Sequence, residues 1–108
     1  MQEFKHTIIK ALLPHIILLE TSGQPIHGYA LIRLIRKKHG IYLGPSTMYP
    51  ALNDLEKQGL IHSQWTSPTL GNDRPRKLYT ITNKGRLLLG QNVTVLTLVN
   101  KMIEVKAT

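Results

Sequence analysis

Residues 45–61 of this 108-residue chain place hydrogen-bonding side chains on a segment that is patterned as a helix. The apolar side follows the i, i+3, i+4, i+7 spacing of one helix face and consists of Met48, Ala51, Leu52 and Leu55. The outward side consists of Thr47, Tyr49, Pro50, Asn53, Lys57 and Gln58, with Ser46 just before it. Most of these outward side chains form hydrogen bonds without carrying charge, which is typical of a helix that reads base edges in DNA.

Local signals predict where this helix begins and ends. Ser46 or Thr47 can cap its start, and Pro50 is expected in the first turn, where a missing N–H costs least. Gly59 supplies a left-handed stop. The predicted helix is therefore about three turns long.

A second group of candidate contact residues is cationic. Residues 60–67 and 76–82 alternate as strands do, and the polar stretch 68–75 between them predicts a hairpin with a long tip. The cations at or beside this tip are Arg74, Arg76 and Lys77. They could form an ordinary charged surface, but we favour contact with DNA phosphates. The basic run 36–39 suits either a helix C-terminus or a phosphate contact.

The residue types needed for catalysis or metal binding do not converge in the sequence. The six acidic residues are scattered among different predicted elements: Glu3, Glu20, Asp54, Glu56, Asp73 and Glu104. The histidines lack the spacing of a metal site, and the chain has no cysteine. We therefore expect no enzymatic activity, no metal and no cofactor.

Fourteen Lys and Arg against six Asp and Glu give a formal net charge of +8, which favours a polyanionic partner. Nucleic acid and an acidic membrane are the candidates. The sequence has no apolar run long enough to span a bilayer and no signal peptide, so we expect a soluble cytoplasmic protein without a membrane partner. Its length indicates one domain.

Two further helices are expected before residue 45. The first covers residues 4–19 and is interrupted at Pro14, which predicts a kink or a new helix starting near Leu13. Its apolar side consists of Phe4, Ile8, Leu12, Ile16 and Leu19, widened by Ile9, Leu13 and Ile17. A loop over 21–25 leads to the second helix, over 26–39, whose inward residues are Tyr29, Ile32 and Ile35, flanked by Leu31 and Leu34.

A long helix is expected over residues 83–106, with a cap at Thr82. Its apolar face is wider and longer than a domain of this size needs to cover, which favours self-association over packing on its own domain. The residues expected at that contact are Leu88, Leu89, Asn92, Val95, Leu96, Val99, Met102 and Ile103. We therefore predict a homodimer.

Five segments in this order resemble the PadR family of transcription regulators, over about residues 10–90. They are His27-Gly28-Tyr29, residues 47–52, residues 55–61, Trp65, and residues 76–82 leading into Gly85. The chain departs from the usual pattern at Ser46, Met48, Pro75 and Leu78, which leaves operator preference open. The chain ends soon after its last helix, which resembles the short subfamily that has no separate C-terminal effector domain.

The resemblance implies a mainly α fold with a small β-hairpin, a winged helix-turn-helix. Residues 1–82 would form the DNA-binding domain, with the wing at about 60–82, and residues 83–108 the dimerisation helix of the same compact unit. It implies a homodimeric repressor of double-stranded DNA on a palindromic operator, and many relatives respond to small molecules such as phenolic acids. A small apolar or aromatic effector is expected between the closing helix and the first helix of the partner subunit, near Phe4, Ile8, Trp65 and Met102. A winged-helix adaptor that binds an acidic protein is the alternative.

Overall fold

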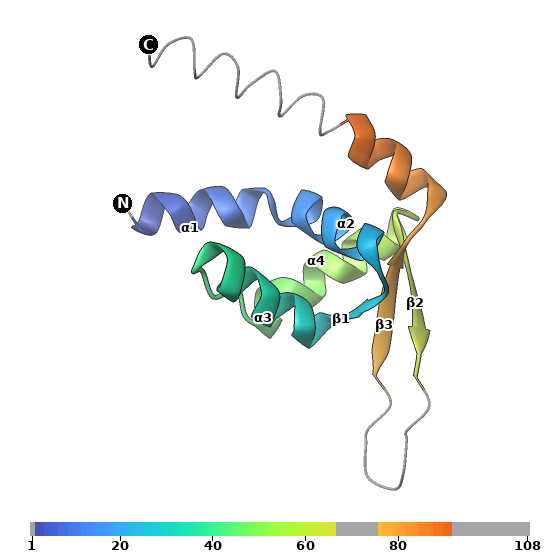
Figure 1. Cartoon of the computed structure of the whole chain (residues 1–108), viewed down its shortest axis with the longest axis horizontal. Coiled ribbons are helices and arrows are strands. Elements are labelled where there is room, and N and C mark those ends of the chain that lie inside the picture. Colours follow the sequence, from blue (N-terminus) through green and yellow to red (C-terminus); the bar gives the residue numbers. More distant parts are fainter. Residues whose placement is uncertain (1, 67–75, 92–108) are drawn as a thin grey trace, which may run out of the picture.

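The computed structural model describes residues 2–66 and 76–91. The elements in chain order are α1 (Gln2–Ala11), α2 (Leu13–Gly23), β1 (Ile26–His27), α3 (Gly28–His39), α4 (Pro45–Lys57), β2 (Ile61–Trp65) and β3 (Lys77–Ile81). A further helix follows over residues 83–91. Figure 1 shows α2, α3 and α4 grouped together, with β2 and β3 extending away from them as the wing of a winged helix-turn-helix.

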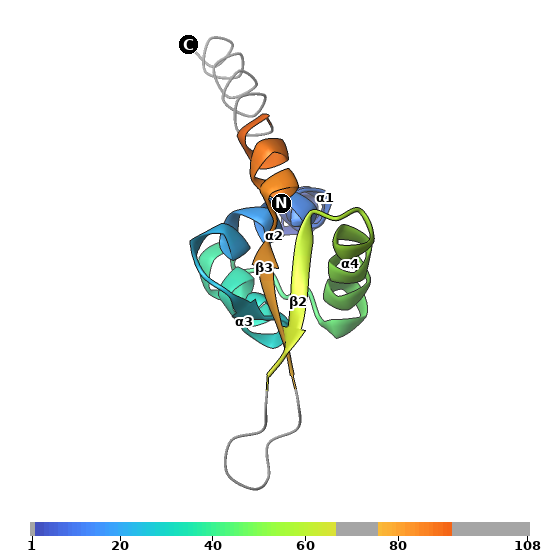
Figure 2. The same ribbon diagram turned by 90° about the vertical axis from the view of Figure 1, so that its right-hand side faces the viewer.

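The hydrophobic core lies where α2, α3 and α4 meet the sheet. Ile17, Leu31, Met48 and Leu52 come from the three helices and are 0% exposed. Tyr79 is the core residue of β3, at 2% exposed. Figure 2 shows α3 and α4 on either side of the strands, so the core fixes the position of α4 relative to the wing.

The sheet has three antiparallel strands in the order β1-β3-β2, one more than the predicted hairpin. Ser63 pairs with Tyr79 in the hairpin, and Ile26 pairs with Tyr79 from the other side. The helix expected from residue 26 therefore begins only at Gly28. A two-residue strand carries no periodic signal, because its structure depends on pairing with a distant strand rather than on local sequence.

Leu12 separates α1 from α2, and Pro14 lies in the first turn of α2, which confirms the alternative of a new helix near Leu13. The expected loop from Thr21 is wrong, because α2 continues to Gly23. The Thr21 hydroxyl donates to the Ile17 carbonyl at 2.7 Å, so this buried polar group is satisfied inside the helix. A threonine with this back-bond can continue a helix where its residue type predicts a loop.

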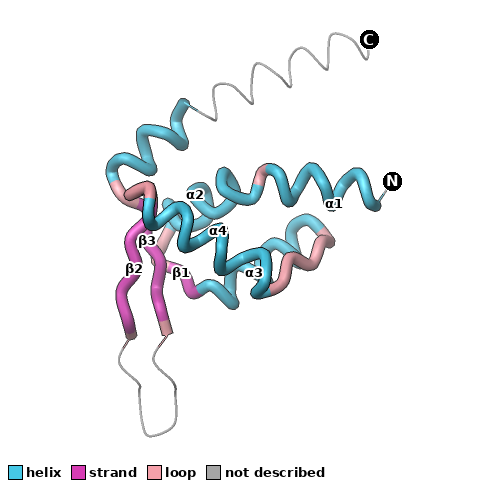
Figure 3. Tube along the Cα trace, turned by 180° about the vertical axis from the view of Figure 1, so that it is seen from behind, coloured by secondary structure: helices cyan, strands magenta, loops and turns pink. Residues whose placement is uncertain are grey.

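Three residues expected on the packed side of the first helical segment are exposed in the single chain: Phe4 at 71%, Ile8 at 42% and Leu19 at 47%. Phe4 and Ile8 belong to α1, which extends past α3 and α4 (Figure 3). In the second predicted helix, Tyr29 is 37% exposed and Leu31 is fully buried, so these two assignments were reversed.

The start of α4 differs from the prediction, whereas its end agrees. Gly44 is the N-cap and no side chain caps the helix, so Pro50 lies in the second turn. Ser46 and Pro50 are both exposed, so water can reach the carbonyl that Pro50 leaves unpaired. At the other end Gly59 has a φ of 76°, which confirms the left-handed stop. The Leu60 N–H donates to the Leu55 carbonyl at 3.0 Å, as in a Schellman motif.

The helix over 83–91 is attached to the end of α4. The Thr82 hydroxyl accepts from the Gly85 N–H at 3.1 Å, which confirms the predicted cap. The same hydroxyl donates to the Gly59 carbonyl at 2.6 Å, and the Lys84 ammonium donates to the Gln58 carbonyl at 2.8 Å. The last two of these hydrogen bonds therefore join the start of the closing helix to the turn after α4.

Leu88 and Leu89 are partly buried and pack against the core. The other residues predicted at the dimer contact lie outside the described residues: Asn92, Val95, Leu96, Val99, Met102 and Ile103. Within residues 2–66 and 76–91, no helix is long and apolar enough to cross a membrane.

Candidate nucleic-acid interface

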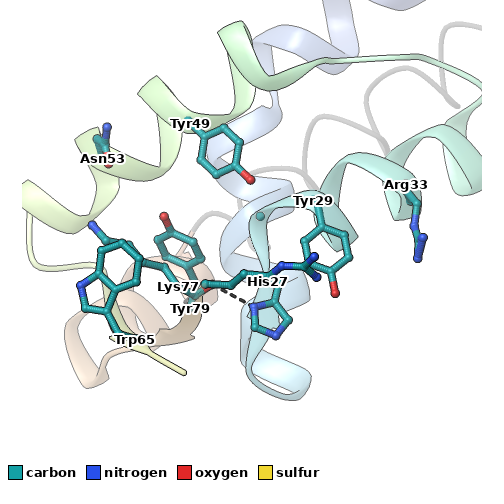
Figure 4. Close-up of a pocket in the computed structure, with 10 residues that line it drawn as sticks. His27, Tyr29, Arg33, Tyr49, Asn53, Trp65, Lys77 and Tyr79 are labelled. Atoms are coloured by element: carbon teal, nitrogen blue, oxygen red, sulfur yellow. Dashed lines mark hydrogen bonds between the residues drawn. The ribbon is translucent and has the colours of Figure 1, made fainter. Parts of the chain in front are cut away.

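A hollow of about 860 Å³ lies between α3, α4 and the wing (Figure 4). Its lining consists of His27, Gly28, Tyr29, Arg33, Tyr49, Asn53, Trp65, Arg76, Lys77 and Tyr79. This lining combines tyrosine and tryptophan rings with the cations Arg33, Arg76 and Lys77, and no carboxylate of residues 2–66 or 76–91 belongs to it. The hollow is therefore suited to a ligand that carries negative charge.

Tyr49 is the α4 side chain that comes closest to α3. A Cβ at position 28 would lie 2.6 Å from the Cε1 atom of its ring, so only glycine leaves room for the ring there. Figure 4 shows the Tyr49 hydroxyl directed toward the start of α3, with Asn53 farther along α4. Tyr49 is 37% exposed, so it packs on Gly28 and still faces solvent.

Tyr29 carries the densest group of ring contacts in the hollow. The His27 ring stacks on it, with centroids 5.4 Å apart and planes at 15°. The guanidinium carbon of Arg33 lies 5.6 Å from the Tyr29 ring centroid, and that of Arg76 lies 4.7 Å from it. Both distances are within the range of cation–π attraction.

The wing contributes a second pair of a cation and a ring. The Lys77 ammonium lies 5.3 Å from the centroid of the Trp65 ring, and Trp65 is 66% exposed. The backbone carbonyl of Lys77 lies 3.1 Å from Nδ1 of His27, at hydrogen-bonding distance. Residue 77 therefore contacts Trp65 through its side chain and the start of α3 through its backbone.

Glu56 connects α4 to β2. Its carboxylate accepts hydrogen bonds from the Ser63 N–H at 3.1 Å and from the Ser63 hydroxyl at 2.5 Å. Burial raises the pKa of Tyr79 above its ordinary value, and Glu56 and then Tyr49 raise it further. The Tyr79 hydroxyl is therefore neutral at physiological pH and can donate a hydrogen bond.

Four of the predicted contact residues come together around this hollow: Tyr49, Asn53, Arg76 and Lys77. Thr47 and Pro50 instead line a second hollow of about 610 Å³, whose other residues include Lys10, His15 and Leu88. Ser46 and Lys57 are exposed on α4 but line neither hollow, and Arg74 lies outside the described residues. The exposed residues of α4 therefore divide between two sides of the helix.

Sequence reasoning missed several residues of the hollow as contact residues, Tyr29 and Arg33 among them. Tyr29 was expected in the core, and Arg33 was assigned no role. The spacing of four residues between them placed both side chains on one face of α3, and that signal could have identified the pair. His27 is the N-cap residue of α3, and its ring stacks on Tyr29.

The residues expected around an effector are not all close together. Trp65 lines the hollow beside the wing, whereas Phe4 and Ile8 lie on α1 (Figure 1). Met102 lies outside the described residues. The expected site lies between two subunits, so the positions of Trp65 and α1 in one chain do not test it, and it stays a prediction.

The described residues contain no group of three or more His, Asp or Glu side chains that could hold a metal ion. Their one salt bridge joins Lys38 to Glu20 at 2.7 Å. At least one cation of the basic run 36–39 is therefore engaged within the protein.

Comparisons with known proteins agree on one family. A family model described as the transcriptional regulator PadR-like family matches residues 16–91. The chain is 28% identical over 92 residues to a transcriptional regulator of Mycobacterium tuberculosis, covering 85% of this chain and 78% of that protein.

Solved structures agree with this match. A PadR-like regulator from Bacillus cereus aligns with a TM-score of 0.80 at 26% identity, over 91% of this chain and 93% of that one. A PadR-like transcription factor from Bacteroides fragilis aligns with a TM-score of 0.77 at 26% identity, over 94% and 96%. Bacillus subtilis PadR in complex with operator DNA aligns with a TM-score of 0.69 at 25% identity, over 76% of this chain and 46% of that one. The chain belongs to the PadR-like family of transcriptional regulators.

Proposed function

We propose that this protein is a cytoplasmic transcriptional regulator that binds double-stranded DNA in a sequence-specific manner. The observation that carries the proposal is the hollow that α4 and the wing share. There the uncharged hydrogen-bonding groups of Tyr49 and Asn53 lie beside the cations Arg76 and Lys77, and none of the described carboxylates lines the hollow. A surface that binds DNA needs both kinds of group, because phosphates are held by charge and bases are read by hydrogen bonds.

The two groups would have different tasks on the duplex. Helix α4 would enter the major groove, where Ser46, Thr47, Tyr49, Pro50, Asn53 and Lys57 would meet base edges or adjacent phosphates. Arg74, Arg76 and Lys77 of the wing would hold phosphates or reach the minor groove. The operator complex of Bacillus subtilis PadR supports this placement, because that protein shares the fold at a TM-score of 0.69.

We further propose a homodimer that represses transcription from an imperfect palindrome. Recognition helices of two subunits would enter major grooves about one helical turn, ~34 Å, apart. Residues 83–106 would hold the dimer, and the predicted apolar face of that segment supports this. Replacing Leu96 with Asp would place a carboxylate in the contact and give a smaller species in light scattering; an unchanged oligomer would refute the placement.

We also propose that a small aromatic or apolar effector binds this protein. Phe4 and Ile8 are exposed on α1 of the single chain, so they are available to a ligand or to the closing helix of a partner. A panel of planar aromatic molecules should shift the unfolding temperature if one of them binds. No shift across the panel would count against an effector of this class.

The proposed function is tested by selecting duplexes from a random library and titrating the best one with salt. DNA binding predicts a preferred sequence and an affinity that falls with salt at a slope of about −0.9 per neutralised phosphate. A scrambled duplex of the same length should bind much more weakly. The alternative, an adaptor for an acidic protein, predicts no preferred duplex, so equal binding of both duplexes would overturn our proposal.

A further inference from the structure

Tyr29 brings together two arginines that are far apart in the sequence. Arg33 lies on α3, one helical turn after Tyr29, and Arg76 directly precedes β3. Both guanidinium groups lie within 6 Å of one tyrosine ring centroid, at 5.6 and 4.7 Å. In Figure 4 the Tyr29 hydroxyl and the Arg33 guanidinium are directed to the same side, out of the hollow.

This arrangement places two positive charges around one ring, and among the described residues no carboxylate pairs with either of them. Arg33 and Arg76 are exposed, and within the described residues neither forms a salt bridge. The face of Tyr29 attracts both cations but offers them one hydroxyl group for hydrogen bonding. Most of their N–H donors are therefore available to a bound group.

We infer that Arg33, Arg76 and the Tyr29 hydroxyl form one clamp for a single phosphate of the DNA backbone. This inference rests on the proposed function and adds two residues to the contact surface. A phosphodiester fits because guanidinium groups bind its oxygens in a bidentate manner and its negative charge reduces the repulsion between the two arginines. Tyr29 is the positioning residue, since its ring holds both guanidinium groups in place.

The clamp would also connect α3 with the wing on the duplex. Arg33 lies on α3, whereas Arg76 directly precedes β3 of the wing. One phosphate held by both would set the angle of the wing relative to α4. Backbone contacts of this kind fix the register in which the recognition helix meets the bases.

The test compares Arg33→Gln, Arg76→Gln and the double variant with the parent on the selected duplex. Each single variant should lower the affinity about tenfold at physiological salt. The salt slope of the double variant should fall by only about 0.9, because both arginines neutralise one phosphate. A fall of about 1.8 would mean two independent phosphates and would overturn the clamp. Lys5→Gln, which removes an exposed charge from α1 outside the hollow, is the matched control.

Tyr29 provides a second test. Tyr29→Leu should weaken binding more than Tyr29→Phe does in the parent, but no more than Tyr29→Phe does in the Arg33→Gln, Arg76→Gln background, because the ring acts through the arginines. Tyr29→Phe keeps the ring and should lose only the part of the DNA affinity that the hydroxyl contributes. Equal losses from Tyr29→Leu in both backgrounds would overturn the positioning role. Circular dichroism confirms that the variants are folded.

These outcomes are distinct from failure of the proposed function. A parent protein that prefers no duplex overturns both the proposed function and the clamp. A parent that binds its selected duplex with a steep salt dependence, while the arginine variants bind equally well, overturns the clamp alone.

Discussion

Replacing Gly85 with Ala should destabilise the protein, because Gly85 lies where the closing helix crosses the chain after α4. A Cβ at this position would be 2.2 Å from the Leu60 carbonyl oxygen and 2.7 Å from Cγ1 of Ile81. Ordinary contacts begin near 3.4 Å, so the closing helix would have to withdraw by more than an ångström. The obstacle is backbone, which cannot move aside as a flexible side chain can.

Gly85→Ala has two destabilising effects and one stabilising effect. Overpacking of this kind costs about 1–3 kcal/mol. Withdrawal also weakens the hydrogen bond from the Gly85 N–H to the Thr82 hydroxyl, and a lost cap costs about 0.5–2 kcal/mol. Alanine in place of glycine stabilises a helix by up to about 1 kcal/mol. We expect a net loss of about 2 kcal/mol, or roughly 10 °C in the unfolding temperature.

Gly90 is the matched control, because it lies in the same helix and a Cβ there would meet nothing within 4 Å. Gly90→Ala should be neutral or stabilising by up to about 1 kcal/mol. Thermal unfolding of the parent and both variants at one protein concentration measures the difference. If Gly85→Ala proves as stable as Gly90→Ala, the contact of the closing helix with the turn after α4 is wrong.

Three further changes probe the interface itself. Gly28→Ala should displace the flexible Tyr49 ring, which lies 2.6 Å from the added Cβ, and so lower DNA affinity with little loss of stability; an unaltered affinity would mean that Tyr49 does not contact DNA. Glu56→Ala should cost about 1–3 kcal/mol in chemical denaturation, because the Ser63 N–H loses its acceptor, and a smaller loss would mean that water replaces the carboxylate. Burial raises the pKa of Tyr79 above 10.0, so the folded protein keeps a proton that the unfolded chain releases and stability falls as the pH rises above about 10. Tyr79→Phe should make this decline shallower in unfolding measured between about pH 9 and pH 11, and an unchanged decline would contradict the assignment.

Local periodicity was sufficient to predict α4 and the hairpin. Met48, Leu52 and Leu55 repeat at helical spacing, and the structure buries all three. The left-handed stop at Gly59 and the cap at Thr82 were also predictable, because each depends on one residue type in a short segment. Predictions of this kind hold where neighbours in sequence decide the structure.

The predictions were wrong where contacts between residues far apart in the sequence determine the structure. Strand β1 exists because Ile26 pairs with Tyr79, more than fifty residues away in the chain. Tyr29 was predicted to be buried on apolar periodicity, but in the structure it supports Arg76, which comes from the wing. A long-range contact of this kind leaves no pattern in the local sequence.

Part of the candidate site was also predictable from local sequence patterns. Tyr49 and Asn53 follow from the pattern of α4, and Arg76 and Lys77 follow from the charge beside the hairpin. These four residues share one hollow because α4 packs against the wing, and local patterns do not predict that packing. The Glu56 carboxylate, which binds Ser63 across this junction, shows how that packing is fixed.

The claim that α4 reads bases while the wing holds the backbone is tested most directly by a base-by-base affinity profile of Asn53→Ala and Arg76→Ala. Each base pair of the selected duplex is changed in turn, and affinities are compared with the parent at one salt concentration. Asn53→Ala should lose about 1–3 kcal/mol on the preferred duplex and tolerate substitution at one position of each half-site. Arg76→Ala should weaken all duplexes by a similar factor and leave the profile unchanged. A profile that Asn53→Ala leaves intact, or that Arg76→Ala alters at a single position, would contradict the account.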